Sequence, residues 1–364
     1  MLFSKFIGVD KTPVAGVDIS QDYITFVKFK KEDSKSLQDY VIQIPTPEGS
    51  YGAGNILQPP VIGEEIRKII DANEIGEVKI NMAIPANIPF IRVLTLPDIP
   101  FDELKVIAQD EAANNLPFPI SEANVDYVLL ENTRRIEDNS KKLIDMLVVA
   151  VPKNIAQKYI DVADAARVKL NSIDITTYSL IKTLANSGQI TEGKHLNVCI
   201  YIGYDYTDIS IISNGMPLFS HITPIGKKNI IETMTSGLGL NDDQVEDFMP
   251  SVAILVPGIA TPTDPQIVKA ATLVRVIYNN ICTEISKAIQ FYKTQKSDSL
   301  EISKMFIGGC GMCIKNADIF IANRLKIDTE IVDPFKNSSV EPEKFIKYNV
   351  ATLATGVGLA LKGL

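Results

Sequence analysis

VAGVDIS (residues 14–20), followed after a short polar turn by YITFVKFK (23–30), decides the fold of this chain. β-Branched and aromatic residues fill both segments, and this composition is typical of paired strands. The pattern returns at NVCIYIG (197–203) and TDISIIS (207–213), and PLFSHITPIG (217–226) follows as a third strand. The two turns lie about 180 residues apart, half of the chain, which indicates an internal duplication.

The length and composition are those of a two-lobed globular protein. A chain of 364 residues is too long for one ordinary core. Hydrophobic residues make up 46% and charged residues 22% of it. The net charge of −8 disfavours attraction to phosphate backbones, so no nucleic-acid partner is expected. No apolar run is long enough to span a bilayer, so no transmembrane segment is expected.

The region between the hairpins mixes strands with two helices. One helix is expected at AQKYIDVADAARV (156–168), followed by the strand NSIDI (171–175). Strands are expected at KINMAIP (79–85), RVLTLP (92–97), VDYVLLE (125–131) and KLIDMLVVAVP (142–152). Apolar residues at helical spacing predict a helix over 102–115, with Asp102 as its N-cap. We interpret residues from about 80 to 170 as a small α+β subdomain inserted in a first lobe that spans 1–195.

The second half reads as a lobe over residues 196–364. A helical subdomain is expected at about 226–298, and a long amphipathic helix begins near Pro265. The strand KMFIGG, a helix after Asn316 and the terminal helix ATLATGVGLAL (351–361) complete this lobe.

Three turns in this order suit a phosphate ligand. A strand–turn–strand hairpin with small or acidic residues can present backbone N–H groups to a phosphate, and two facing hairpins could hold a nucleotide from both sides. The glycine-rich turn IGGCGMC (307–313) would let a ligand approach the backbone closely. Each signal is weak alone, since hairpins and glycine pairs occur in most folds.

The Cys310–Cys313 pair has a chemical and a structural interpretation. One C-x-x-C is half of a zinc site or a redox pair. No second pair exists, and His195 and His221 are the only histidines. The pair overlaps the glycine turn, where small residues suit close packing, so we favour the structural interpretation and expect no metal site and no catalytic residues.

Seven stretches together resemble the actin and sugar-kinase superfamily, and specifically the type IV pilus assembly PilM family. They are GVDISQDYITFVKF (16–29), LPFPISEANVDY (116–127), VAVPKNIAQKYIDVADAARVKLNSIDI (149–175), IYIGYDYTDISIISNGMPLFSHITPIG (200–226), EISKAIQFYKTQ (284–295), FIGGCGMCIKNADIFIANRL (306–325) and YNVATLATGVGLAL (348–361). The resemblance covers nearly the whole chain. It implies an α/β fold of two duplicated actin-like (ribonuclease-H-like) lobes, with a small α+β subdomain inserted in the first.

The resemblance also implies a site for ATP with Mg²⁺. The candidate nucleotide-binding residues are Asp18, Ser20, Thr25, Gly203, Glu284, Lys287, Gly308 and Gly309. Asp18 matches the acidic residue that supports Mg²⁺ in the superfamily. Three positions depart from the pattern: Ser20 replaces a glycine, Thr25 replaces a phosphate-binding basic residue, and Tyr201 replaces a second carboxylate.

These departures weaken catalysis more than binding. Phosphoryl transfer depends mainly on positioning and on charge compensation by Mg²⁺ and basic groups. Hydroxyl groups at Ser20 and Thr25 can still donate hydrogen bonds to a phosphate. ATP binding is therefore open, efficient hydrolysis is not expected, and we do not expect an enzyme.

The family resemblance implies a scaffold on the cytoplasmic face of the inner membrane. Such a protein binds the N-terminal tail of a PilN-type bitopic membrane protein in a groove between the inserted subdomain and the first lobe. It would thereby couple the pilus assembly ATPases to the periplasmic complex, with self-association as a further expectation. Peptide capture needs no reacting groups, which suits this sequence.

Two other functions have the same superfamily fold. A cell-division actin homologue that polymerises on the membrane normally carries a C-terminal amphipathic membrane helix after a linker, whereas the last segment here reads as a core helix. A genuine ATPase or sugar kinase would require the carboxylate that Tyr201 replaces. We therefore expect the scaffold.

Overall fold

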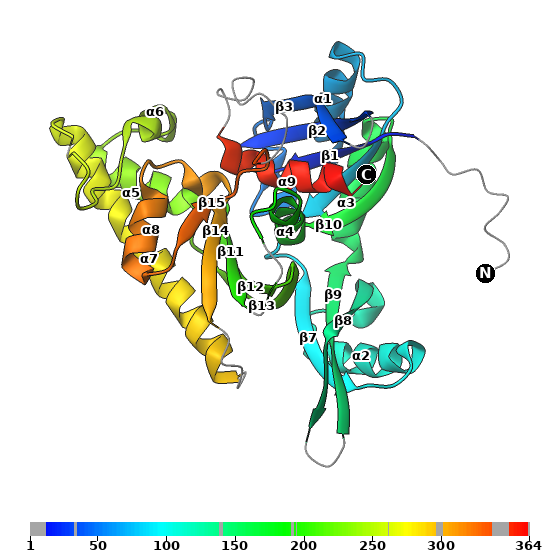
Figure 1. The fold of residues 1–364 in the computed structure, drawn as a ribbon. Helices are drawn as coiled ribbons and strands as arrows, with labels where there is room; N and C mark the ends of the chain where they lie inside the picture. Colours follow the sequence, from blue (N-terminus) through cyan, green and yellow to red (C-terminus); the bar gives the residue numbers. More distant parts are fainter. Residues whose placement is uncertain are drawn as a thin grey trace.

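The computed structural model describes residues 12–32, 35–137, 141–190, 193, 195–260, 262–295, 301–336 and 349–362 (Figure 1). Its frame is two five-stranded sheets. The first has the order β3 (Lys35–Pro45), β2 (Tyr23–Glu32), β1 (Val14–Ile19), β6 (Lys79–Ile84) and β10 (Lys169–Ile175). The second has the order β13 (Met216–Thr223), β12 (Thr207–Ser213), β11 (Leu196–Ile202), β14 (Ile302–Gly308) and β15 (Thr329–Ile331).

The two sheets share one topology, and this confirms the predicted duplication. In each sheet three antiparallel strands are followed by two strands parallel to the first. The central strands β1, β6 and β11 are almost wholly buried, because both faces of each sheet are covered by helices. Continuous apolar runs are the sequence pattern that such burial requires.

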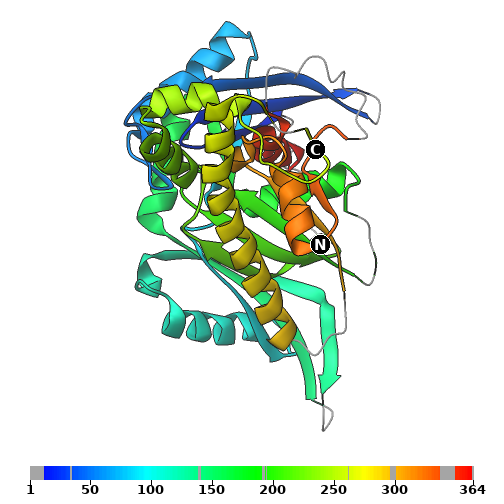
Figure 2. The same ribbon diagram turned by 90° about the vertical axis from the view of Figure 1, so that its left-hand side faces the viewer.

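Helices cover the outer face of each sheet. On the first sheet these are α1 (Pro59–Ala72) and α3 (Lys153–Ala165), and on the second they are α5 (Lys227–Leu238), α7 (Pro265–Gln295) and α8 (Ala317–Leu325). The apolar residues of α7 recur every three to four positions and form one buried stripe along the helix. Figure 2 shows α7 running along the length of the molecule. The short α6 (Asp242–Phe248) follows α5.

Two helices pack against each other between the sheets: α4 (Thr176–Asn186) and α9 (Val350–Leu361) (Figure 1). A Cβ atom at Gly358 would lie 1.8 Å from the Ser179 carbonyl oxygen of α4, and one at Gly16 of β1 would lie 2.2 Å from the Gly356 carbonyl oxygen. These glycines therefore allow backbones to touch. α9 packs on β1 and β2, so this last helix lies on the first lobe, not within a second lobe that extends to residue 364.

The inserted subdomain is narrower than the expected 80–170. It consists of β7 (Phe90–Pro97), α2 (Phe101–Asn115), β8 (Ala123–Glu137) and β9 (Lys141–Pro152), with strand order β7-β9-β8. Leu104 and Ala108 of α2 pack on Ile144 and Met146 of β9. β6 and α3 belong to the first lobe instead. The N-cap position of α2 is Pro100 rather than Asp102, which lies in the first turn and there complements the helix dipole.

Small elements complete the described chain. β4 (Tyr51–Gly52) and β5 (Asn55–Ile56) form a two-stranded ribbon before α1. Short 3-10 helices span Ile120–Glu122, Met249–Ser251 and Cys310–Met312.

Candidate functional site

The turns of the two duplicated hairpins meet between the lobes. The first turn (20–22) joins β1 to β2, and the second (203–206) joins β11 to β12. Lys227, at the start of α5, contacts both. Its Nζ donates to Asp22 Oδ2 at 2.9 Å, and its backbone N–H donates to the Gly203 carbonyl oxygen at 2.9 Å. The structure therefore brings together the two turns that the sequence suggested for a nucleotide.

Asp18 lies near the end of β1 as a buried carboxylate with an exposed fraction of 7%. Within the described part of the chain its carboxylate accepts no hydrogen bond and has no cationic partner. Burial raises its pKa to about 7, because a carboxylate that loses water without gaining a donor or a cation is costly to charge. A magnesium–nucleotide would supply the missing positive charge, so this residue fits the implied group.

Tyr201 occupies the position of the second hairpin that corresponds to Asp18. Asp18 pairs with Thr25 across the first hairpin, and Tyr201 pairs with Asp208 across the second. Tyr201 is buried, and its ring centroid lies 5.8 Å from that of Tyr206. An aromatic pair thus fills the place where the resemblance leads one to expect a second carboxylate.

The predicted hydroxyls form hydrogen bonds within the protein. Ser20 Oγ donates to the Tyr23 carbonyl oxygen at 3.0 Å and accepts from the Tyr23 N–H at 3.2 Å, so it closes the first turn. Thr25 is buried, and its Oγ1 accepts from Gln43 Nε2 at 3.0 Å. Either hydroxyl would have to give up its hydrogen bond within the protein before it could bond to a phosphate.

The glycine turn packs against the second hairpin. Gly309 has a φ of +98°, and a Cβ there would lie 2.3 Å from the Ile202 carbonyl oxygen. Its N–H donates to the Ala351 carbonyl oxygen of α9 at 3.0 Å, and Gly308 pairs with Tyr201. Gly309 therefore allows the turn after β14 to approach the end of β11 closely, whereas a Cβ at Gly308 would lie 3.3 Å from its nearest neighbour outside the adjoining residues, a Leu180 methyl carbon.

Glu284 and Lys287 lie on α7, and the structure does not place them with the hairpin turns. Glu284 bonds to Lys287 at 2.8 Å and to His221 of β13 at 3.2 Å. His221 belongs to the face of the second sheet that packs on α7, whereas Asp208 faces α4. Lys287 is largely exposed.

Three charged residues beside the hairpin turns were not predicted: Asp22 in the first turn, Lys227 at the start of α5 and Glu246 of α6. Lys227 Nζ also contacts Glu246 Oε1 of α6 at 3.0 Å, so the amine joins one carboxylate from each lobe. The only local signal was a lysine directly after a glycine at the end of a strand. Its partners lie far away in sequence, so this signal did not identify them.

The four cysteines are free thiols. Cys310 is buried in the glycine turn, and Cys313 Sγ lies 3.7 Å from Met249 Sδ. Burial raises the pKa of Cys313 to about 11, which keeps this thiol protonated and weakly reactive near neutral pH. No group of three or more histidine, cysteine or acidic side chains is placed to hold a metal ion within the described ranges.

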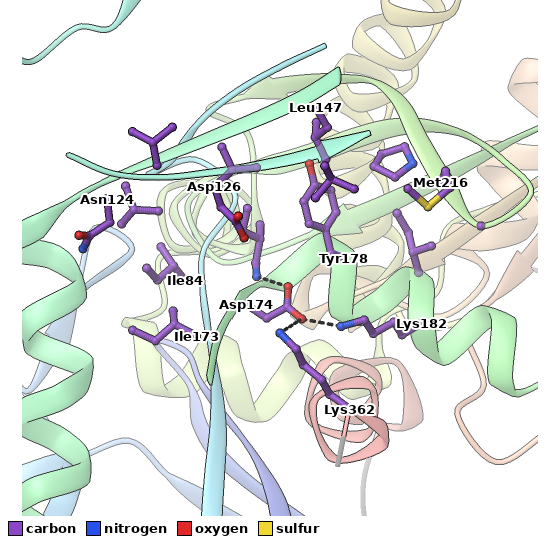
Figure 3. Close-up of a pocket in the computed structure, with 18 of the residues that line it drawn as sticks. Ile84, Asn124, Asp126, Leu147, Ile173, Asp174, Tyr178, Lys182, Met216 and Lys362 are labelled. Carbon is purple, nitrogen blue, oxygen red and sulfur yellow. Dashed lines mark hydrogen bonds and ion pairs between the residues drawn. The ribbon is translucent and has the colours of Figure 1, made fainter. Parts of the chain in front are cut away.

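A second candidate site is a groove between the inserted subdomain and the first lobe (Figure 3). Its volume is about 510 Å³, within the range of ligand pockets. Apolar side chains dominate the lining, among them Val128, Leu147 and Val149 of the subdomain and Ile175 and Ile181 of the lobe. The turn between β12 and β13 closes one side.

Two strand edges border this groove. β8 is the edge strand of the three-stranded sheet, and β10 is the edge strand of the first five-stranded sheet. Consecutive residues line the groove from both strands: Asn124, Val125 and Asp126 from β8, and Ile173, Asp174 and Ile175 from β10. Asn124, Asp126 and Val128 of β8 pair with Val151, Val149 and Leu147 of β9, and all six line the groove. Paired and alternate residues share one face of a sheet, so this face of the three-stranded sheet forms one wall of the groove, beside the edge of β8. An edge strand presents backbone groups to an incoming strand.

A charged cluster marks one end of the groove (Figure 3). Asp174 Oδ2 accepts from Lys182 Nζ at 2.7 Å and from Lys362 Nζ at 3.4 Å. Burial acts to raise the pKa of Asp174, but the bond from Lys182 and the two positive charges hold it below its usual range. The groove therefore combines apolar walls with a few fixed polar groups, as ligand sites do.

Comparison with known proteins identifies the family to which this architecture belongs. The chain matches the model of the family described as "Type IV pilus assembly protein PilM" over residues 16–364. No curated protein matches the sequence significantly. The structure is similar to that of a PilM-PilN type IV pilus biogenesis complex, with a TM-score of 0.80, 17% identity, and coverage of 97% of this chain and 99% of that one.

More distant structures share the fold alone. One is MreB 5 of Spiroplasma citri bound to AMPPNP, with a TM-score of 0.50, 12% identity, and coverage of 92% of this chain and 96% of that one. Another is the MamK double helical filament, with a TM-score of 0.53, 10% identity, and coverage of 96% and 97%. The duplicated sheets, the facing hairpin turns and the match over nearly all residues lead to one conclusion: this chain has an actin-like fold and belongs to the PilM family of type IV pilus assembly proteins.

Proposed function

We propose that this protein is a cytoplasmic scaffold of type IV pilus assembly that captures the N-terminal tail of a PilN-type inner-membrane protein. The observation that supports this function best is the groove between β8 and β10, which has mainly apolar walls and is lined in part by two edge strands. The similar structure is described as a PilM-PilN complex, so a tail of this kind is the natural occupant to test.

The groove suits an extended peptide. A tail that adds to the edge of β8 or β10 would gain main-chain hydrogen bonds along the strand, and alternate side chains would enter the apolar lining. An extended segment advances about 3.3 Å per residue, so a groove of this size would hold a short segment of a few residues. Such binding would hold the protein at the inner membrane through its partner. No helix in the described ranges is long and apolar enough to cross a membrane.

ATP with Mg²⁺ enters this proposal as a regulatory ligand. Asp18 would support the cation, and the two hairpin turns would approach the phosphates from the two lobes. Bound Mg²⁺ would compensate the negative charge of the phosphates and would also supply the positive charge that Asp18 lacks. Because Tyr201 replaces the second carboxylate, efficient hydrolysis is not part of the proposal. A nucleotide that prefers closed lobes would bias which partners bind, the pilus assembly ATPases and further copies of the chain among them.

A matched pair of variants on β8 tests the groove. Val128 lines it and is 40% exposed, whereas Ile136 lies further along the same strand, outside the lining, and is 71% exposed. Val128→Glu should weaken binding of a fluorescent tail peptide by at least about tenfold, because it places an unpaired charge in an apolar groove. Ile136→Glu should bind like the wild type. Equal peptide affinity in both variants, with unchanged melting temperatures, would exclude the groove as the tail site.

A further inference from the structure

The buried amine of Lys227 is the feature from which this inference starts. It extends from the second lobe to Asp22 in the turn of the first lobe, and both side chains are 7% exposed. Glu246 of α6, which is 45% exposed, completes the cluster, and the amine lies 6.0 Å from the centroid of the Tyr204 ring. A flexible lysine is thus held at one point between the two hairpin turns.

Stability alone is a weak reason for this arrangement. Two charges removed from water lose solvation that their attraction barely repays, so a buried ion pair contributes little net stability. Burial acts to lower the pKa of Lys227, but Asp22 and Glu246 raise it well above its ordinary value. The amine therefore stays charged at every physiological pH, next to the turns on which a nucleotide site would be built.

The first hairpin lacks the cation that a polyphosphate would require there. Thr25 stands at the position of the basic residue, and its hydroxyl is bonded to Gln43. Asp18 is a buried carboxylate without a partner among the described residues. It lies four residues before Asp22, the partner of Lys227, in the same hairpin. An acidic group suited to a metal ion and a cation suited to a phosphate thus meet at one hairpin, with Asp18 in its first strand and Lys227 at its turn.

We propose that Lys227 is the phosphate-binding cation between the two hairpin turns and that Asp22 and Glu246 hold it as an inter-lobe latch until a polyphosphate replaces them. This inference rests on the proposed nucleotide role. Phosphate oxygens accept charge-assisted hydrogen bonds from an ammonium group as carboxylates do, so the exchange keeps the amine paired. The ligand competes with the protein's own carboxylates, and the latch sets how tightly a nucleoside triphosphate binds.

Calorimetric titration of the full chain with Mg-ATP, tripolyphosphate and adenosine tests this role. Lys227→Met keeps the length of the side chain and removes its charge, and it should weaken Mg-ATP and tripolyphosphate by about tenfold or more. The affinity for adenosine should not change. Asp22→Asn should strengthen both phosphate ligands by about fivefold to tenfold, since it removes the competitor. The adjacent, exposed Lys228 provides the matched control, and Lys228→Met should bind like the wild type.

Three results would overturn the proposal. The first is an equal loss of Mg-ATP affinity in Lys227→Met and Lys228→Met. The second is weaker binding of Mg-ATP by Asp22→Asn than by the wild type. The third is no binding of Mg-ATP by either the wild type or Asp22→Asn. Thermal melting of each variant separates loss of folding from loss of a contact. The same proteins are titrated with the tail peptide. If the wild type does not bind the tail peptide, the proposed function of the groove is wrong. If Lys227→Met keeps the ATP affinity of the wild type, the proposed latch is wrong.

Discussion

Each hairpin carries one buried aspartate within its strands, and the two aspartates lie on opposite strands and in opposite environments. Asp208, on the second strand of its hairpin, accepts hydrogen bonds from three hydroxyl groups, those of Thr177, Ser210 and Ser220. Asp18, on the first strand of the other hairpin, accepts none from the described residues. Burial raises the pKa of both carboxyl groups, but the hydroxyls counteract the effect at Asp208.

This contrast separates a structural carboxylate from one that is available. Thr177 belongs to α4, so Asp208 joins the connecting helix to the second sheet. A buried carboxylate whose hydrogen bonds are all formed stabilises the packing around it. A buried carboxylate without partners destabilises the folded state unless a ligand pairs with it. Duplication thus produced two similar hairpins, and the difference between them lies in which aspartate remains unsatisfied.

Giving the second hairpin a carboxylate at Tyr201, the position that corresponds to Asp18, should have the largest effect on stability. Tyr201→Asp removes a buried aromatic ring and places a second carboxylate near Asp18. We expect it to reduce the free energy of unfolding by at least about 4 kcal/mol, because a cavity and an unpaired buried charge arise together. Urea denaturation measures this, and millimolar Mg²⁺ should restore part of the loss.

Tyr201→Phe is the control for that variant and should cost less than about 1 kcal/mol, since the ring remains. If Tyr201→Asp unfolds at the urea concentration of the wild type, the ring does not contribute to the core as the structure indicates.

Removing the satisfied aspartate should have the next largest effect. Asp208→Ala leaves the hydroxyls of buried Thr177 and Ser210 and of half-buried Ser220 without their acceptor, and it should cost about 3 kcal/mol in the free energy of unfolding. The equivalent position in the first hairpin is Thr25, which has one hydrogen bond to Gln43. Thr25→Val should therefore cost less than about 1.5 kcal/mol by the same urea measurement. Equal losses in the two variants would contradict the contrast between the hairpins.

Neutralising the unsatisfied aspartate should give a smaller change of opposite sign. The pKa of Asp18 is about 7 in the folded chain, against 3.8 for an ordinary aspartate, so the folded state holds the proton over this range. Stability must therefore fall as the pH rises from about 4 to about 7, by up to about 4 kcal/mol. Asp18→Asn removes this slope but leaves an unsatisfied buried amide, so its net gain at pH 8 should be about 2 kcal/mol.

Urea unfolding between pH 4 and pH 8 measures that slope. At pH 4 the variant and the wild type should be equally stable, because the protonated acid and the amide are both neutral. If the wild type loses no more stability than Asp18→Asn between pH 4 and pH 8, Asp18 is solvated or paired.

Sequence patterns predicted the fold well where they were periodic or repeated. Both hairpins, the long helix α7 and the glycine turn lie where the patterns indicated, because alternation and helical spacing are local properties. β3 and α1 were not predicted, although α1 has a proline in its first turn and buried Ile62, Ile66 and Ile69 at helical spacing. The partner sheet of α9 was also missed, because a helix that is apolar on all sides does not indicate which surface it covers.

The sequence by itself determined the duplication, the family and the replacement of a carboxylate by Tyr201, since these depend on residue order alone. The tertiary structure alone decided which side chains meet. Asp22 and Lys227 are 205 residues apart, yet they form one buried pair. The groove arises likewise from two edge strands, β8 and β10, that belong to different sheets. Long-range juxtaposition follows from how the lobes and the inserted subdomain pack, and no local pattern of residues encodes it.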